Sequence, residues 1–440
     1  MSNGNSNIFA SDSIGILDRA IQQISLPERE TSRFISNEGL TIILEPARTY
    51  PLTSIDLLVK AGSLNEWTYQ KNGLAHLVEH LVLRVERFPQ DLVWLKRDII
   101  GETFFDRTEY RLISSSENVE LALHTLFCLL RGKEFDQPSF EIEKEVIAQE
   151  MDLLNRHEDE LLSSLFWESV FLEDNLQSAS LENQQPSLND AYQFYKREYA
   201  PQNTILAIAG DFRCRIIEEF VNEMPSCANR EIFEGLQKRK SFYPMTNGSA
   251  VGSRNSKIIH RVTNSGIARE LLGYIIESFS SNQLQDLDLL SVVINLKIRR
   301  KLARRKNLSR YLFNLYTFFY PLENTGLFLI KSAFRPQVGR EVQELVSAVV
   351  SEIKTELLSQ EELALAKAHL LNLQLSRYTL ANRARALALS EARGLSSDFN
   401  ASYAESVKMA SSAGVVCCAQ RHLDDRKLRR CVLMPNKARC

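Results

Sequence analysis

The spacing of apolar residues along the chain predicts two successive parts, each built from strands and helices. In the first part, TIILEP at 41–46, SIDLLVKAG at 54–62 and NTILAIAG at 203–210 are apolar, β-rich runs that predict strands. A looser alternation predicts one further strand over 103–114. Four segments have apolar residues at helical spacing and are predicted as helices: 73–85, 89–99, 117–130 and 140–156.

The pattern restarts after a segment at 226–256 that contains several Gly, Pro and Asn residues and is predicted to be a linker. The elements predicted beyond it are helices over 287–305, 337–358 and 361–392, an aromatic strand pair over 311–334 and a last strand over 430–436. We therefore expect an α+β fold of two homologous halves, each an antiparallel sheet with helices packed on one face. The expected boundaries are an N-terminal extension at 1–36, a first domain at 37–225 and a second domain at 257–440.

Composition places the chain among ordinary globular proteins. Of its 440 residues, 44% are hydrophobic and 25% charged, and 53 basic against 55 acidic residues leave a formal net charge of −2. This excludes a disordered tail, a collagen-like repeat and a disulfide-rich miniprotein, and it gives no general attraction to nucleic acid. The seven cysteines include no CxxC pair, which favours a reducing compartment. No signal peptide or membrane-spanning run is visible, so we expect a cytoplasmic protein without a membrane partner.

The most specific chemical signal is HLVEH at 76–80, an HxxEH motif. His76 and His80 are four residues apart, so on the predicted helix they face the same side and can bind one Zn²⁺ through neutral imidazole nitrogens. Glu79 lies near that face and is suited to act as the general base toward a zinc-bound water. The alternative interpretation is two surface histidines on a helix beside an unrelated glutamate.

A catalytic zinc needs a third protein ligand and one open position. The acid-rich helix predicted over 140–156 offers four candidates: Glu141, Glu143, Glu145 and Glu150. Glu143 and Glu150 share a helix face, but at 1.5 Å per residue they lie about 10 Å apart along the axis. One of the two should bind the metal, and the other should stand behind a ligand or contact substrate. A solvated acidic face is the alternative interpretation.

GLAHLVEH at 73–80 resembles the active-site helix of the pitrilysin/insulinase-type zinc metallopeptidases, whose HxxEH motif is the inverzincin signature. Glu66 matches a glutamate that precedes this motif in the family, and EKEVIAQE at 143–150 matches the family's downstream glutamates. The resemblance implies a Zn²⁺ cofactor with His76, His80 and Glu150 as its ligands. It also implies that Glu143 does not bind the metal and instead supports one of these ligands.

IGETFFDRTEY at 100–110 resembles the family's substrate-binding edge strand, which has the form NAxTxxDxTxY. The resemblance implies that Gly101 and Thr103 bind substrate on a strand that pairs with the extended peptide. Ile100 stands where the family has asparagine. One polar contact to the substrate backbone is therefore expected to be missing, which affects how substrate docks rather than the zinc ligands.

The second half carries a weaker match. ARRKNLSRYLF at 303–313 resembles the family's RxxxxxxY element, which implies that Arg304 and Tyr311 reach the substrate near the zinc. The chain's length resembles the short branch of the family, which includes the subunits of mitochondrial processing peptidase and pairs two chains around a chamber. The resemblance thus implies a peptide substrate, and either a homodimer or a heterodimer with a zinc-less homologue.

These observations predict a zinc-dependent endopeptidase that hydrolyses peptides or small precursor proteins in an enclosed chamber. A non-catalytic peptide-binding or assembly subunit is the first alternative. Ile100 favours it, whereas the complete HxxEH motif with Glu150 opposes it. A nucleic-acid-binding protein is the second, because the segment 297–310 holds eight basic residues. No aromatic interleaving accompanies them, so no nucleic-acid partner is expected.

Overall fold

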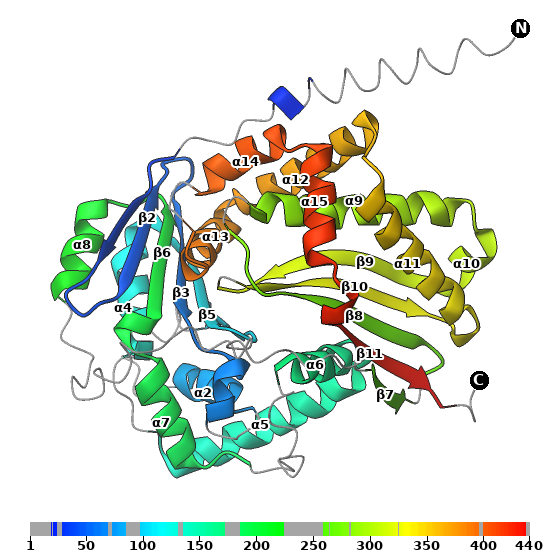
Figure 1. Ribbon diagram of the computed structural model, residues 1–440. Helices are drawn as coiled ribbons and strands as arrows, with labels where there is room; N and C mark the ends of the chain where they lie inside the picture. Colours follow the sequence, from blue (N-terminus) through cyan, green and yellow to red (C-terminus); the bar gives the residue numbers. More distant parts are fainter. Residues whose placement is uncertain are drawn as a thin grey trace, which may run out of the picture.

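Two β-sheets, one from each part of the chain, organise the fold (Figure 1). The computed structural model describes residues 19, 21–23, 29–68, 73–84, 97–130, 135–171, 185–223, 258–263, 265–280, 283–323, 325–395 and 399–436. The predicted linker at 226–256 lies outside these residues, as does most of the predicted extension at 1–36. The two halves lie side by side, and each is a sheet with helices packed on it.

The first sheet has six strands in the order β1-β2-β6-β3-β5-β4. Their bounds are β1 Ser32–Ile35, β2 Thr41–Pro46, β3 Leu52–Val59, β4 Ile100–Thr103, β5 Thr108–Ser115 and β6 Thr204–Gly210. Neighbouring strands are antiparallel except β2 and β6, which are parallel. β4 lies at one edge of the sheet and β1 at the other, so the outer edge of β4 pairs with no other strand that the structure describes.

The helices on one face of this sheet enclose the first hydrophobic core, to which Leu57 of β3, Leu77 and Phe194 all contribute. They are α2 Leu74–Leu83, α4 Val119–Leu130, α5 Gln137–Arg156, α7 Leu188–Glu198 and α8 Cys214–Glu223. Short 3₁₀ segments, η1 Ser63–Thr68, η3 Ser116–Asn118 and η5 Pro201–Asn203, join some of these elements. The helix α6 Glu158–Phe171 follows α5 but contacts the other half of the chain.

The second sheet has five strands in the order β7-β11-β8-β10-β9. Their bounds are β7 Ile258–Thr263, β8 Ala268–Ile276, β9 Leu312–Pro321, β10 Gly326–Phe334 and β11 Leu428–Pro435. Only β7 and β11 are parallel. The helices of this half are α9 Leu284–Ala303, α10 Lys306–Tyr311, α11 Gly339–Thr355, α12 Gln360–Arg377, α13 Leu380–Ala392, α14 Phe399–Met409 and α15 Ser412–His422, with η8 Pro336–Val338 and η9 Asp425–Lys427. None of the helices in the described ranges is long and apolar enough to span a bilayer.

Each half contributes one helix to the opposite face of the other half's sheet. Leu387 of α13 packs on Leu58 of β3, within a small apolar cluster of the first sheet. Phe166 of α6 packs against Leu271 and Leu329 of the second sheet. A Cβ on Gly273 would lie 2.2 Å from Phe166 Cζ, so a glycine is needed where this ring meets β8. The expected fold of two halves, each a sheet with helices packed on it, is confirmed, and the exchanged helices α6 and α13 add a buried surface that the two halves share.

The predicted strand over 103–114 is in fact a hairpin. β4 ends at Thr103 and β5 begins at Thr108, and between them the N–H of Phe104 donates to the carbonyl of Arg107 at 2.7 Å. The turn escaped prediction because Phe104 and Phe105 continue the apolar pattern of the strand into it, and Phe105 stacks on Trp167 of α6, with ring centroids 4.3 Å apart. Of the helix predicted over 89–99, only 97–99 are described, and these are not helical.

Candidate metal centre

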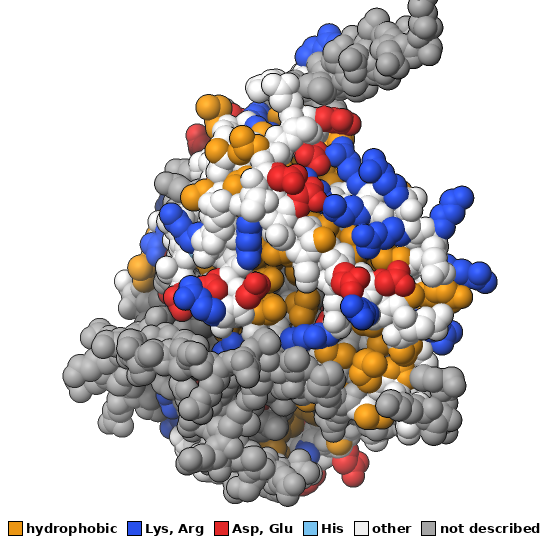
Figure 2. All heavy atoms as spheres, turned by 45° about the vertical axis from the view of Figure 1, so that its right-hand side comes forward, with side chains coloured by type: hydrophobic (Ala, Val, Ile, Leu, Met, Phe, Trp, Pro, Cys, Tyr) orange, Lys and Arg blue, Asp and Glu red, His pale blue; other side chains and the backbone are white. Residues whose placement is uncertain are grey.

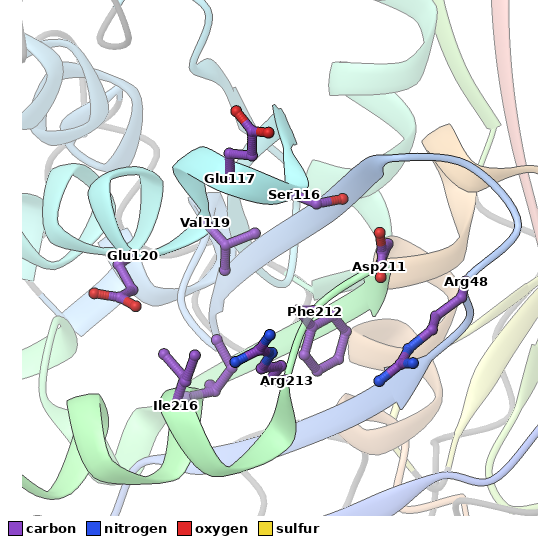
Figure 3. A pocket seen from close by; sticks show the side chains of 10 residues that line it. Arg48, Ser116, Glu117, Val119, Glu120, Asp211, Phe212, Arg213 and Ile216 are labelled. Atoms are coloured by element: carbon purple, nitrogen blue, oxygen red, sulfur yellow. The ribbon is translucent and has the colours of Figure 1, made fainter.

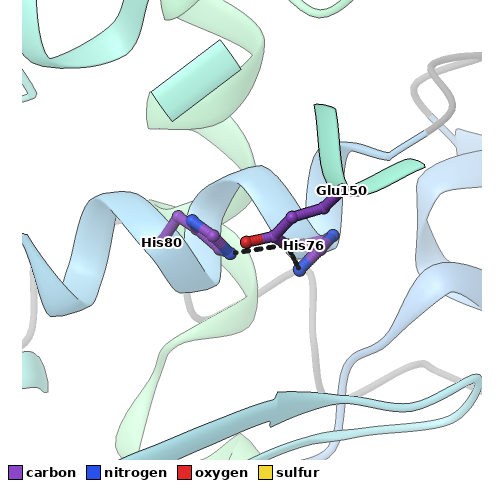
Figure 4. Close-up of side chains that lie close together, drawn as sticks. All are labelled: His76, His80 and Glu150. Atoms are coloured by element: carbon purple, nitrogen blue, oxygen red, sulfur yellow. Dashed lines mark ion pairs between the residues drawn. The ribbon is translucent and has the colours of Figure 1, made fainter. Parts of the chain in front are cut away.

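Helix α2 carries the two histidines of the HxxEH motif (Figure 4). Its buried positions, among them Leu77, Val78 and Leu81, face the first core and fix the rotation of the helix. The His76 and His80 rings therefore share one side of α2, with centroids 4.7 Å apart and planes at 87°. Burial and the neighbouring His80 lower the pKa of His76 to about 4, so its imidazole is neutral and available as a ligand at pH 7.

The start of α2 is held by Glu66 rather than by an adjacent capping side chain. Gly73, the residue before the helix, has a left-handed φ of 77° and provides no side-chain cap. Glu66 Oε2 instead accepts a hydrogen bond from Gly73 N and Oε1 accepts one from Ala75 N, each at 2.8 Å. Burial raises the pKa of Glu66 to about 8. The glutamate satisfies amides at the helix start and so fixes the first turn, which contains His76.

Helix α5 brings Glu150 to the histidines. Glu150 Oε2 lies 3.5 Å from His76 Nε2 and 3.5 Å from His80 Nε2, and the three donor atoms lie within 4.8 Å of one another. Donors at about 2.0–2.1 Å from a tetrahedral zinc are separated by about 3.3 Å. Two imidazole nitrogens and one carboxylate oxygen at these separations fit zinc and leave a fourth position open. His76, His80 and Glu150 are the metal-ligand cluster found among the described residues.

Glu143 lies seven residues before Glu150 on α5 and contacts Nδ1 of His80, the ring nitrogen that faces away from the ligand cluster. Its Oε2 lies 3.0 Å from His80 Nδ1, and its Oε1 accepts a hydrogen bond from Arg84 Nη1 at 2.5 Å. A carboxylate on Nδ1 leaves Nε2 free to face the cluster and increases the basicity of the ring. Arg84 was missed in the sequence, although it lies four residues after His80 on the same helix face.

Glu79 lies on α2 next to these ligands but points toward strand β4. Its side chain is only 5% exposed, and Thr103 Oγ1 donates to Glu79 Oε2 at 2.6 Å. Burial raises the pKa of Glu79, and the Thr103 hydrogen bond partly offsets this. A Cβ on Gly101 would lie 2.5 Å from Glu79 Oε1, so the glycine leaves room for the carboxylate. Gly101 and Thr103, predicted as substrate-binding residues, thus contact the predicted base directly.

A buried pair of tyrosines on the same side of the sheet was not predicted as part of the site. The hydroxyls of Tyr110 on β5 and Tyr199 lie 2.7 Å apart. Burial raises the pKa of both, and the nearby Glu79 charge raises them further. Tyr110 belongs to the strand motif noted in the sequence, whereas nothing local marks Tyr199, which reaches it across 89 residues of chain.

Arg304 and Tyr311 do not join the cluster within this chain. Arg304 follows the last residue of α9, and Tyr311 is the last residue of α10. Figure 1 shows α10 at the far end of the second sheet, well separated from α2. The nearby basic run is partly neutralised by acidic partners, because Lys297 and Lys301 both pair with Glu352. Figure 2 shows basic and acidic side chains interspersed over the face that it presents.

A separate cavity lies between the turn after β2 and the starts of α4 and α8 (Figure 3). It has a volume of about 510 Å³, and Arg48, Asp211 and Arg213 are among the residues that line it. None of the zinc-ligand candidates contributes to it. The cavity is therefore distinct from the metal centre.

Comparison with known proteins identifies the family of this chain. Residues 41–184 match the family described as insulinase (peptidase family M16), and residues 187–370 match the peptidase M16 inactive domain. The chain therefore belongs to the insulinase-type M16 peptidase family. The boundary between the two matches precedes α7, although α7, β6 and α8 complete the first sheet and its core.

The individual relatives are distant in sequence, and their matches differ in length. The chain is 22% identical to the zinc protease PqqE of Helicobacter pylori over 369 residues, which is 78% of each chain. It is 28% identical to the β subunit of the mitochondrial-processing peptidase of Saccharomyces cerevisiae over 143 residues, covering 31% of this chain and 30% of that one. The crystal structure of a protease from H. pylori has a TM-score of 0.77 at 20% identity, covering 93% of this chain and all of that one. A peptidase M16 inactive domain from Pseudomonas fluorescens has a TM-score of 0.74 at 16% identity, covering 92% of this chain and 98% of that one.

Proposed function

We propose that the protein is a zinc-dependent endopeptidase that hydrolyses peptides or small precursor proteins in an enclosed chamber. The observation that carries the proposal is the convergence of His76, His80 and Glu150, with the buried carboxyl group of Glu79 on the same helix. A zinc ion held by the three donors would supply a Lewis acid and lower the pKa of a water molecule. The relatives named zinc proteases support the same metal.

The chain's own residues would then orient the substrate and move the proton. Glu79 accepts a proton from the attacking water and passes it to the leaving amine. Thr103 holds the Glu79 carboxyl group through a hydrogen bond. Gly101 has no side chain and so leaves the space that this carboxyl group occupies. The outer edge of β4, which pairs with no strand among the described residues, offers backbone N–H and C=O groups to an extended peptide. One strand would therefore both align the substrate and hold the base.

The second candidate is a non-catalytic peptide-binding or assembly subunit that keeps the peptidase fold. Ile100 supports it: the side chain at the start of β4 is 58% exposed and apolar where the resembling family has an amide. The similar P. fluorescens structure is described as an inactive domain, so a protein with this fold need not be described as an active peptidase. The intact ligand set and Glu79 support catalysis instead.

We also infer that the chamber is completed by a second chain, either another copy or a zinc-less homologue. Two observations support this. Helix α10, which follows Arg304 and ends at Tyr311, lies far from α2 of the same chain, and one relative is named as the β subunit of a peptidase. A cytoplasmic location stays a prediction from the sequence.

Zinc content and peptide cleavage, measured in the same samples, test the proposal. Wild-type protein is compared with His76→Ala, Glu150→Gln and Glu79→Gln, and Glu145→Gln on the exposed side of α5 is the control. The peptidase reading expects about one zinc per chain, lost in the first two variants and kept in Glu79→Gln, with cleavage lost in all three. Zinc binding without cleavage of any peptide in a mixed library, alone or with a homologous chain, would favour the non-catalytic subunit.

A further inference from the structure

A second polar site lies on the opposite face of the first sheet from α2. Asp56 of β3 is cross-strand partner to Arg111 of β5, and both face α13, which contributes Arg385. Asp56 is only 1% exposed, yet neither of its carboxyl oxygens has a hydrogen-bond partner among the described residues. Buried polar groups are nearly always hydrogen-bonded, so this carboxyl group calls for an occupant.

The space for an occupant is present. Asp56 lines a cavity of about 470 Å³, together with Arg97, Arg111, Arg385 and the exposed side chains of Ile100 and Ile113. That volume is within the range of small-ligand pockets. The first turn of α13, at Ala381 and Asn382, also lines the cavity, and no side chain caps this helix. The positive end of the α13 dipole therefore borders the same space.

The charges that line the cavity favour an anion over a cation. Arg111 pairs with Glu102 at 2.6 Å and Arg385 with Glu109 at 2.7 Å, so these two arginines are already held in place. Arg111 Nε lies 3.7 Å from Glu109 Oε2 but makes no hydrogen bond with any described residue. Arg97 adds a third guanidinium, and Asp98 is the other acid in the lining.

Burial, followed by the negative charge of Glu109, raises the pKa of Asp56 well above its ordinary value, and the positive charges of Arg111, Arg385 and Arg107 oppose this shift. In its protonated form the carboxyl group can donate a hydrogen bond to an anionic oxygen. A cation, by contrast, would be placed beside three guanidinium groups.

We propose that this cavity binds a carboxylate group borne on an apolar body, held by Arg97, Arg111, Arg385 and the Asp56 carboxyl group. A guanidinium group can donate two parallel hydrogen bonds to the two oxygens of a carboxylate. Ile100 and Ile113 can contact the apolar part of the same ligand. Two sources share this chemistry: the free C-terminus of a peptide and an acidic side chain within one. The cavity lies across the sheet from the metal centre, so binding there does not depend on hydrolysis.

Fluorescence anisotropy with three labelled tripeptides tests the site in the full-length protein. Each probe carries an uncharged fluorophore on its N-terminus, and the three peptides are Ala-Ala-Leu with a free carboxylate, the same peptide as its C-terminal amide, and Ala-Glu-Leu-amide. We expect the wild type to bind at least one of the two acids about tenfold more tightly than the neutral amide, the value of one charge-assisted hydrogen bond. Which acid binds identifies the source.

Variants separate this cavity from the metal centre. Arg385→Gln and Arg111→Gln are expected to weaken the acid probe about tenfold, and Arg385→Lys, which keeps the charge but loses the fork, should weaken it less. His76→Ala, which disrupts the metal centre, and Arg213→Gln, a surface control, should leave binding unchanged. Thermal melting curves confirm that each variant is folded.

The alternative outcomes are distinct. Loss of acid binding in His76→Ala, with retention in Arg385→Gln, would place the carboxylate at the metal centre and overturn the proposal. Equal binding of acid and amide, or no binding at millimolar concentrations, would overturn the proposal. Absence of zinc or of cleavage in the wild type would bear on the peptidase proposal and leave this result unaffected.

Discussion

Glu143 Oε2 lies 3.0 Å from His80 Nδ1, and this contact ties the acid-rich helix α5 to the outer nitrogen of a predicted metal ligand. Seven residues further along the same helix, Glu150 reaches the inner nitrogens of both histidines. One helix therefore supplies both a ligand and the group that orients another ligand. The arrangement makes several outcomes measurable.

The first prediction concerns Glu143 and zinc affinity. Glu143→Gln keeps the shape of the side chain but removes the charge that His80 Nδ1 and Arg84 contact. Zinc affinity should fall by about 10–100-fold, the usual effect of losing such a partner. Competition with a chromophoric chelator measures it, and the exposed Glu145→Gln on the same helix is the control. Equal affinity in both variants would remove Glu143 from the metal centre.

The second prediction separates two roles for Thr103. If Thr103 holds Glu79, Thr103→Val should lower kcat about tenfold at unchanged zinc content, and Thr103→Ser should restore it, because a lost hydrogen bond to a charged group costs about 1.5–3 kcal/mol. If Thr103 instead binds substrate, as the sequence predicted, KM should rise while kcat stays near the wild-type value. Steady-state kinetics with one peptide substrate distinguishes these outcomes.

The third prediction is a pH dependence of stability that belongs to Glu66. Its pKa in the folded chain is about 8 against an ordinary 4.5, so the folded chain binds more protons than the unfolded chain between those values. The free energy of unfolding should therefore decrease as pH rises toward 8. The lowered pKa of His76, about 4, contributes in the opposite direction, and that contribution fades as pH rises past its ordinary value of 6.5, so the interval 6.5–8 reduces it.

Urea unfolding of the metal-free protein at pH 6.5 and pH 8 measures this dependence. Glu66→Gln cannot ionise and should show a smaller decrease over that interval than the wild type. Every other titrating group, including Asp56, is common to both proteins and drops out of the difference. An identical decrease in the two proteins would mean that Glu66 does not titrate in this range.

The fourth prediction concerns the exchange of helices between the halves. Phe166 of α6 is fully buried against the second sheet. Phe166→Ala should destabilise the protein by about 3–5 kcal/mol, the usual cost of deleting a buried aromatic ring. Because α6 and α13 link the halves, both should unfold together in one calorimetric transition.

The matched control is Phe313→Ala, since Phe313 is 53% exposed and should tolerate truncation with little change. Two separate transitions in the wild type would show that the halves are independent in stability. In that case the shared surface made by α6 and α13 would contribute little.

The sequence by itself determined the local parts of the site. Spacing of four residues on an apolar-faced helix places His76 and His80 on one side, whatever the surrounding fold. Spacing of seven puts Glu143 and Glu150 on one face of α5 but too far apart to share a metal. These relationships follow from helix geometry alone, which is why they could be read from residue numbers.

Tertiary structure decided how distant segments meet. Which glutamate reaches the histidines depends on the packing of α5 against α2, and the residue-number spacing left that choice open. The contact of Thr103 with Glu79, the capping of α2 by Glu66 and the hairpin between β4 and β5 likewise depend on packing. So does the isolation of Asp56 beneath α13, a helix more than 300 residues later in the chain. Periodicity records which face of an element is buried, but only the folded chain specifies what lies against that face.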